Sequence, residues 1–131
     1  MKNYRRTNTT VSMINYHLIF CLRYRRKIFL IDGVEARFKE LVSQICEQNG
    51  FRIIAMECDR DHCHLFVNVP PTVSPHMVMK AVKGITSKYL RNEFPQLSKM
   101  PSLWTRSYFA STAGEVSSST VEQYIRNQKA R

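Results

Sequence analysis

The chain has 131 residues, of which 44% are hydrophobic and 23% are charged. We expect one domain over residues 1–131, because this length suits a single core and the composition excludes a disordered tail. Twenty lysines and arginines against ten acidic residues give a formal net charge of +10, which favours nucleic acid over membrane surfaces as a partner. Every apolar stretch is far shorter than the roughly 20 residues of a spanning helix. Without a hydrophobic signal core near the N-terminus, we expect a cytoplasmic protein that associates with the nucleoid when bound to DNA.

The first half of the chain indicates a strand followed by a helix. Residues 11–24 are rich in β-branched and aromatic types, which predicts one long strand. Asp32 then stands three residues before Glu35, the spacing of a capping box at the start of a helix. Apolar residues follow at helical spacing as far as Asn49–Gly50, so the pattern predicts a helix over residues 33–48.

The middle of the chain indicates a β-hairpin and a second helix. Residues 51–58 and 62–69 are two strand-like runs separated by a short polar turn. Ser74–Pro75 then supplies the favoured cap and first residue of a helix that Phe94–Pro95 ends. The predicted buried stripe of this helix consists of Val78, Val82, Ile85 and Tyr89.

The last segments complete the expected fold. Residues 103–113 resemble a final strand, and Ser119 with Glu122 gives a second capping-box spacing before a short helix to about Lys129. The predicted order βαββαβα suits an α+β fold with a ferredoxin-like or RNA-recognition-like antiparallel sheet. We expect the first two helices on one face of the sheet and the terminal helix as an addition.

Two histidines could bind a metal ion. His62 and His64 are two residues apart on a predicted strand and therefore point to the same face, whereas Cys63 points into the core. The pattern alone is equally typical of two half-exposed strand histidines. Zinc is a competing metal, because Cys58 lies nearby with Cys63, but alternation turns Cys63 away from both histidines.

A tyrosine near the C-terminus could act as a nucleophile. Tyr124 and Gln128 are four residues apart and share one face of the terminal helix. The phenol would be the nucleophile, and the amide oxygen is a suitable ligand for a hard cation. The same spacing also describes the core stripe of an amphipathic helix. Tyr108 is the alternative tyrosine, although its aromatic strand-like setting favours a core role.

Five ordered segments of the chain resemble the HUH single-tyrosine transposases, the TnpA group of small bacterial and archaeal insertion sequences. They are Tyr16–Lys27, Asp61–Leu65, Lys83–Gly84, Leu103–Phe109 and Tyr124–Gln128. The resemblance implies that His62 and His64 are the HUH histidines. It further implies that Tyr124 is the catalytic nucleophile and Gln128 the third metal ligand.

The same resemblance implies an activity, a cofactor and partners. Members of this group cleave and rejoin single-stranded DNA at insertion-sequence ends through a 5′-phosphotyrosine intermediate, with Mg²⁺ or Mn²⁺, and recognise DNA hairpins. They act as homodimers in which the terminal helix of one subunit completes the active site of the other. The small, polar segment 114–120 suits a hinge for such an exchange.

Basic side chains are candidates for holding the DNA backbone, through charge neutralisation that salt would weaken. They are Arg23, Arg25, Arg26, Lys27, Lys80, Lys83, Lys88 and Arg91. His17 and His76 have no partner at ligand spacing, which favours structural roles. Two alternatives remain: a domesticated HUH enzyme that acts on chromosomal palindromes, and a non-enzymatic nucleic-acid-binding module, which would stack bases on exposed sheet aromatics.

Overall fold

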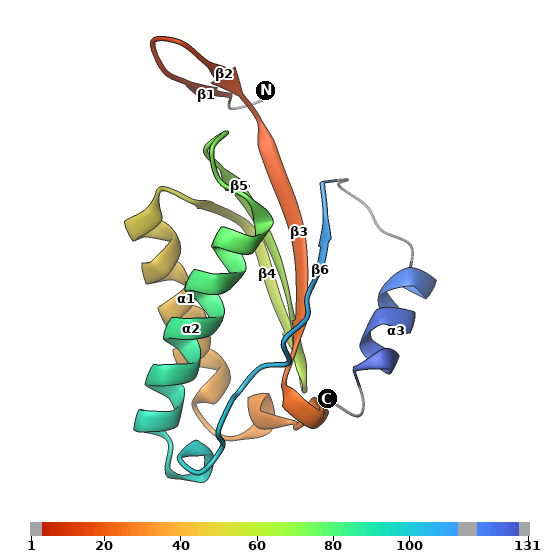
Figure 1. Cartoon of the computed structure of the whole chain (residues 1–131). Coiled ribbons are helices and arrows are strands. Elements are labelled where there is room, and N and C mark those ends of the chain that lie inside the picture. Colours follow the sequence, from red (N-terminus) through yellow and green to blue (C-terminus); the bar gives the residue numbers. More distant parts are fainter. Residues whose placement is uncertain (1–3, 113–117, 129–131) are drawn as a thin grey trace.

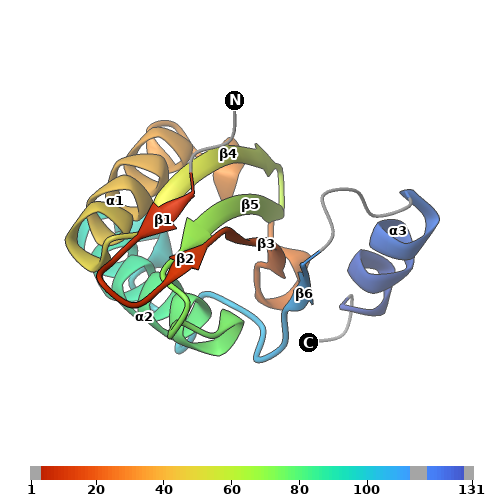
Figure 2. The same ribbon diagram turned by 90° about the horizontal axis from the view of Figure 1, so that it is seen from above.

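The computed structural model describes residues 4–112 and 118–128. Its centre is a four-stranded antiparallel sheet in the order β4-β5-β3-β6. The strands are β3 (Ile14–Cys21), β4 (Arg52–Asp59), β5 (His62–Val69) and β6 (Phe109–Ser111). Helices α1 (Val34–Asn49) and α2 (Pro75–Glu93) lie side by side on one face, as Figure 2 shows. This arrangement confirms the predicted α+β fold with a ferredoxin-like strand order.

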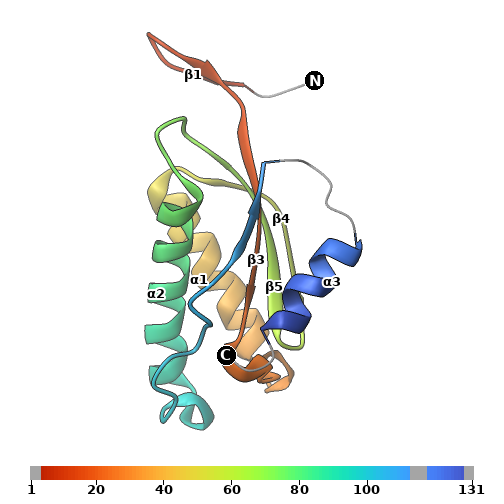
Figure 3. The same cartoon turned by 45° about the vertical axis from the view of Figure 1, so that its right-hand side comes forward.

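The terminal helix α3 (Ser118–Asn127) lies on the opposite side of the sheet from α1 and α2 (Figure 3). The sheet therefore separates two apolar clusters. The large one fills the space beneath α1 and α2, and the small one joins Ile125 of α3 to Ile19 and Cys21 of β3. None of the helices among the described residues is both long and apolar enough to cross a membrane.

Aromatic rings form the centre of the large cluster. The ring of Trp104 lies 4.9 Å from that of Phe20 on β3 and 5.5 Å from that of Phe38 on α1, measured between centroids. All three side chains are buried, and the indole nitrogen donates to Thr86 Oγ1 of α2 at 3.0 Å. The segment before β6 is thereby fixed to the core by packing, although its first residues do not form a strand.

The N-terminal part of the chain differs from the single long strand predicted over 11–24. A separate hairpin of β1 (Arg5–Arg6) and β2 (Val11–Ser12) extends beyond the main sheet, as Figure 1 shows, and β3 ends at Cys21. A short 3₁₀ turn, η1 (Arg23–Arg25), then reverses the chain. The hairpin strands are only two residues long, too short for an alternating pattern that sequence analysis could detect.

Helix α1 does not begin as the capping-box spacing predicted. Its N-cap is Gly33, with φ of 84°, and no side chain caps the helix start. A left-handed backbone at this position suits glycine, which has no Cβ to clash. The end of the helix agrees with the prediction, because Gly50 adopts φ of 73° and its amide donates to the last-turn carbonyls.

Helix α2 begins as predicted and buries a slightly different stripe. The Ser74 hydroxyl accepts a hydrogen bond from the Met77 amide, and Pro75 is the first helical residue. The predicted Ile85 and Tyr89 are 38% and 42% exposed. The buried residues are Met79 and a row that recurs at every fourth position, Val78, Val82, Thr86 and Leu90. Thr86 fits the core because its hydroxyl donates to the Val82 carbonyl at 2.7 Å.

Two further boundaries differ from the predictions. Strand β6 covers only Phe109–Ser111 of the expected 103–113, because the earlier residues of that segment turn to pack in the core or accept bonds from α2. Ser119 lies inside α3 rather than at its cap. Gly114 and Lys129 lie outside the described residues, and so does most of the segment proposed as a hinge, whose last three residues belong to α3.

Candidate active site

The two predicted metal ligands share one face of the sheet. On β5, His64 pairs with Ile19 of β3 and His62 pairs with Cys21. Paired residues on neighbouring strands point to the same side, so both imidazoles lie on the face opposite to α1 and α2. Their ring centroids are 5.1 Å apart, at an interplanar angle of 64°. Cys63 between them is fully buried in the large cluster, as the alternation predicted.

A carboxylate orients His62. Asp61 Oδ1 lies 2.8 Å from His62 Nδ1, and Asp61 Oδ2 accepts a hydrogen bond from Arg25 Nε at 3.1 Å. Burial acts to raise the pKa of Asp61, but the hydrogen bond from His62 and the Arg25 charge outweigh it and bring that pKa below its ordinary value. An ionised Asp61 that binds the Nδ1–H group leaves Nε2 as the lone-pair nitrogen, which is the tautomer a metal ligand needs.

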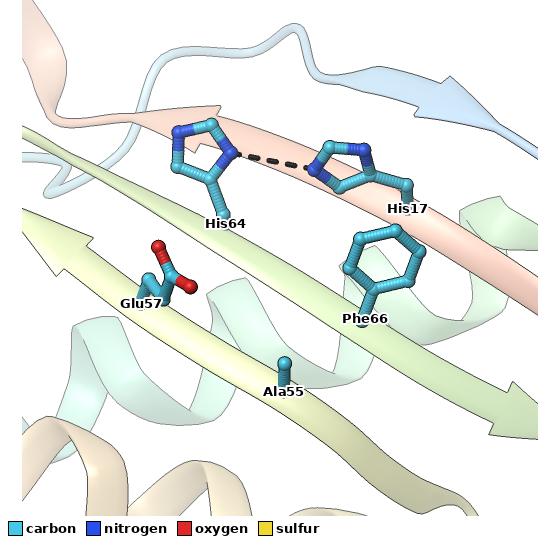
Figure 4. Close-up of a pocket in the computed structure, with 5 residues that line it drawn as sticks. All are labelled: His17, Ala55, Glu57, His64 and Phe66. Carbon is cyan, nitrogen blue, oxygen red and sulfur yellow. Dashed lines mark hydrogen bonds between the residues drawn. The ribbon is translucent and has the colours of Figure 1, made fainter. Parts of the chain in front are cut away.

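A third histidine, His17, supports His64. His64 Nδ1 lies 3.3 Å from His17 Nε2, and Figure 4 shows the two rings facing each other across β3 and β5. The His17 ring stacks on Phe66 at a centroid distance of 4.3 Å. The pair borders a cavity of about 160 Å³ that Glu57 and Ala55 of β4 complete. His17 has no partner at ligand spacing in the sequence, which favoured a structural role, and it is the register between β3 and β5 that brings it to His64.

Burial keeps these rings neutral. It lowers the pKa of His64 and of His17, and for His64 the neighbouring His62 and His17 lower it further. Glu57 opposes the shift at both rings but does not reverse it. A neutral imidazole retains a lone pair, so the environment suits His64 as a metal ligand at neutral pH.

The predicted nucleophile and third ligand meet at one serine. The Tyr124 hydroxyl lies 3.0 Å from Ser107 Oγ, and Ser107 Oγ donates to Gln128 Oε1 at 2.8 Å. Because serine has a single proton and gives it to Gln128, the tyrosine is the donor in the other contact. Gln128 is 3% exposed. Sequence analysis missed Ser107, although it lies within one of the segments that carried the family resemblance.

Lys83 of α2 fixes the segment that carries Ser107. Its ammonium donates to the Ser107 carbonyl at 2.7 Å and to the Thr105 carbonyl at 2.9 Å, and it lies 5.5 Å from the centre of the Tyr108 ring. Burial lowers the pKa of Lys83 to about 8. Lys83, one of the predicted DNA contacts, is therefore half-buried, and its ammonium is bound to the backbone.

The tyrosine helix covers the histidine face within one chain. Ile125 packs on Ile19 and Cys21, the residues of β3 that pair with His64 and His62. Tyr124 packs beside this cluster, with its ring 6.0 Å from that of Phe109. The structure thus brings the tyrosine and the two histidines to the same side of the sheet without a second subunit.

The donor set of the described side chains does not form the closed cluster of a structural zinc site. No group of three histidine, cysteine or acidic side chains converges on a metal site in the part of the chain that the structure describes. The zinc alternative is therefore wrong: Cys58 pairs with Cys63, and Cys63 faces the core. Two imidazoles on one face, each with its Nδ1 next to an orienting partner, leave room for a divalent cation that takes its remaining ligands from oxygen atoms such as the Gln128 amide.

The structure divides the eight predicted DNA contacts into two groups. Three are committed to the protein: Arg25 to Asp61, Lys83 to two carbonyls, and Arg91 to the Met100 and Pro101 carbonyls. The other five lie on the surface, with Arg23 partly covered and the rest exposed. They are Arg23, Arg26, Lys27, Lys80 and Lys88.

Comparison with known proteins gives a consistent result. A family model described as "Transposase IS200 like" matches residues 10–128. The ISDra2 transposase TnpA of Deinococcus radiodurans is 32% identical over 121 residues, which cover 90% of this chain and 86% of that protein. The IS200 transposase of Salmonella typhimurium is 30% identical over 116 residues, covering 86% of this chain and 75% of that protein.

Two solved structures resemble the whole fold. A crystal structure of a transposase candidate from Deinococcus radiodurans R1 superposes with a TM-score of 0.87 at 31% identity, covering 97% of this chain and 99% of that one. A REP-associated tyrosine transposase bound to a REP hairpin superposes with a TM-score of 0.61 at 14% identity, covering 97% and 68%, and so supports the fold alone. The family match over nearly the full length shows that this chain belongs to the IS200-like transposases.

Proposed function

We propose that this transposase cleaves and rejoins single-stranded DNA at insertion-sequence ends by forming a covalent bond between Tyr124 and a 5′ phosphate. One observation carries the proposal: the Tyr124 hydroxyl and the Gln128 amide converge on Ser107 above the sheet face that bears the two HUH histidines.

The proposed reaction conserves the energy of the phosphodiester bond. The Tyr124 oxygen attacks phosphorus, the bond from phosphorus to the 3′ oxygen breaks, and the departing 3′ oxygen takes up a proton. The phenol proton passes to solvent or to water on the DNA. In the return step a free 3′ hydroxyl attacks the phosphotyrosine, joins the strands and releases the tyrosine, so no ATP is required.

The histidines and Gln128 would hold Mg²⁺ or Mn²⁺ beside the phosphate. Such an ion supplies Lewis-acid charge to a non-bridging phosphate oxygen. Asp61 and His17 orient the two imidazoles, and neutral ligands leave the full positive charge for the substrate. An amide oxygen has two lone pairs, so Gln128 Oε1 can accept from Ser107 and still bind a cation.

DNA hairpins are the proposed substrates and a homodimer is the proposed assembly. A net charge of +10 suits a folded single strand of DNA, and the REP-associated neighbour with the same fold was solved on a hairpin. The family resemblance implies that subunits exchange their tyrosine helices, whereas α3 here packs on its own sheet. Mixing inactive Tyr124→Phe subunits with inactive His64→Ala subunits separates the two arrangements, since only exchange restores one working site per heterodimer.

The direct test is a covalent adduct. Incubation of the protein with labelled hairpin-bearing single strands and Mn²⁺ should give a protein–DNA species, and peptide mass spectrometry should locate the nucleotide on Tyr124. Tyr124→Phe keeps the ring and removes only the oxygen, so folding and hairpin binding should survive while the adduct disappears. An adduct on Tyr108 would overturn the assignment. Hairpin binding without any adduct would favour the non-enzymatic module, and cleavage confined to chromosomal palindromes would favour a domesticated enzyme.

A further inference from the structure

A strained turn presents an aromatic ring to solvent directly after β3. Tyr24 has φ of 58° and the next residue, Arg25, has φ of 50°. Two consecutive non-glycine residues in the left-handed region are energetically unfavourable and persist only where the surroundings hold them, most often at functional sites. The Tyr24 side chain is 55% exposed. Its ring thus contributes little to the core that would explain the strain.

Contacts on both sides hold this turn in place. The Leu22 amide donates to the Asp61 carbonyl at 2.9 Å, and the Arg23 amide donates to the Leu103 carbonyl at 2.9 Å. The Arg25 side chain is paired with Asp61. Strand β5 and the segment before β6 therefore fix the backbone around Tyr24 while its ring remains accessible.

The ring borders a basic hollow. This cavity has a volume of about 370 Å³, and its lining includes the cations Arg23, Arg26 and Lys99 but no acidic residue of the described chain. The guanidinium carbons of Arg23 and Arg26 lie 5.8 and 5.9 Å from the centre of the Tyr24 ring. The volume falls within the roughly 300–1,000 Å³ of small-ligand sites, and the charge calls for an anionic ligand.

A second basic hollow adjoins the first. It has a volume of about 400 Å³ and shares Ser102 with the first. Its lining includes Lys83, Arg91 and Arg106, again without an acidic residue of the described chain. Arg106 directly precedes Ser107, which contacts Tyr124. Arg106 is exposed, whereas Lys83 and Arg91 are bonded to backbone carbonyls and add positive charge to the same hollow. A chain of phosphates could therefore run from Tyr24 past Arg106 toward Ser107.

We propose that Tyr24 stacks an unpaired nucleobase of single-stranded DNA whose backbone follows the two basic hollows toward Ser107. The inference rests on the proposed function for the identity of the strand. An exposed aromatic ring flanked by guanidinium groups in a basic groove is the combination that binds single strands without base pairing, because every unpaired base offers a face for stacking. The cations would neutralise the phosphates on either side of the stacked base.

The test separates stacking from charge. In a Tyr124→Phe background, which prevents cleavage, equilibrium binding is measured for an oligothymidylate of about 15 nucleotides and for an abasic strand of equal length. Tyr24→Ala should weaken binding of the oligothymidylate about tenfold and leave the abasic strand unchanged, whereas Tyr24→Phe should bind both as the parent does. Tyr89→Ala removes a tyrosine of similar exposure on α2 and is the matched control, expected to have no effect.

A second variant guards against misfolding. Glycine accepts the left-handed backbone at position 24, so Tyr24→Gly should fold at least as well as the parent and still lose the base-dependent binding. Equal losses on both strands, or no loss on either, would overturn the stacking site. The binding test does not depend on catalysis. Base-dependent binding by a protein that forms no covalent adduct would contradict only the proposed function. A covalent adduct together with unchanged binding by the Tyr24 variants would contradict only the stacking site.

Discussion

The histidine face and the tyrosine helix are held with different firmness. His62 and His64 lie on β5, which is paired with β3 on one side and β4 on the other, and their rings are braced by Asp61 and His17. Tyr124 lies on a helix of ten residues, and among the side chains described there Ile125 is the buried apolar one. The proposed metal site would gain from fixed ligands, whereas the proposed nucleophile, bonded to DNA through two reactions, would gain from a support that can move.

Loss of a histidine tests the histidine face and should give the largest effect on cleavage. His64→Ala removes one of the two proposed imidazole ligands, so adduct formation with Mn²⁺ should fall by about a thousandfold or more. A chelator should lower adduct formation by the wild-type protein to the same extent. Hairpin affinity should change little, because phosphate contacts dominate it. His76→Ala removes an exposed histidine of α2 and is the control. Undiminished cleavage by His64→Ala would contradict the metal site.

Removal of the Asp61 carboxylate charge tests how much the contact between Asp61 and His62 contributes to metal binding. Asp61→Asn keeps the shape but weakens the orientation of His62 and leaves Arg25 without its ion pair. Mn²⁺ affinity, measured by titrating adduct formation against metal, should fall about 10- to 100-fold. Asp59→Asn is a neighbouring exposed control on β4. An unchanged metal titration would mean that β5 alone positions the ring.

Truncation of Ile125 tests how the tyrosine helix is docked on the sheet. Ile125→Ala should destabilise the docking of α3 by about 2 kcal/mol, which hydrogen exchange would detect as faster exchange confined to that helix. The main melting transition should stay in place, because the large cluster lies on the other side of the sheet. Leu65→Ala, in the large cluster, should instead lower the melting temperature of the whole domain. An equal drop in the melting temperature of the domain for both variants would show that α3 and the rest of the fold unfold together.

Titration of Lys83 should give the smallest effect. Its pKa of about 8, against 10.5 for an ordinary lysine, means that the folded chain is charged there below pH 8 and has lost that charge by pH 9. The slope of log affinity for single-stranded DNA against log salt should therefore shrink by up to about 0.7 between pH 7 and 9. Lys83→Gln should flatten this change, whereas Lys80→Gln, at an exposed position, should retain it. A slope that does not depend on pH would remove Lys83 from the DNA path.

Local patterns in the sequence predicted most of the helices and strands, but they could not predict contacts between segments that are far apart in the chain. Ser74–Pro75 and Gly50 signalled helix ends correctly, because capping depends on neighbouring residues only. The shared face of His62 and His64 followed from strand alternation in the same way. Ser107 and His17 could not be assigned, since their partners are 17 to 47 residues away and only the sheet register and the docking of α3 bring them together.

Asp61 connects two places that the DNA and the metal would each occupy. Its carboxylate bonds both His62 and Arg25, and its carbonyl accepts the Leu22 amide beside Tyr24. DNA bound at the Tyr24 turn and a cation bound by the histidines would therefore both affect the position of Asp61. Linkage is reciprocal, so the factor by which bound DNA changes the affinity for the cation equals the factor by which the cation changes the affinity for DNA.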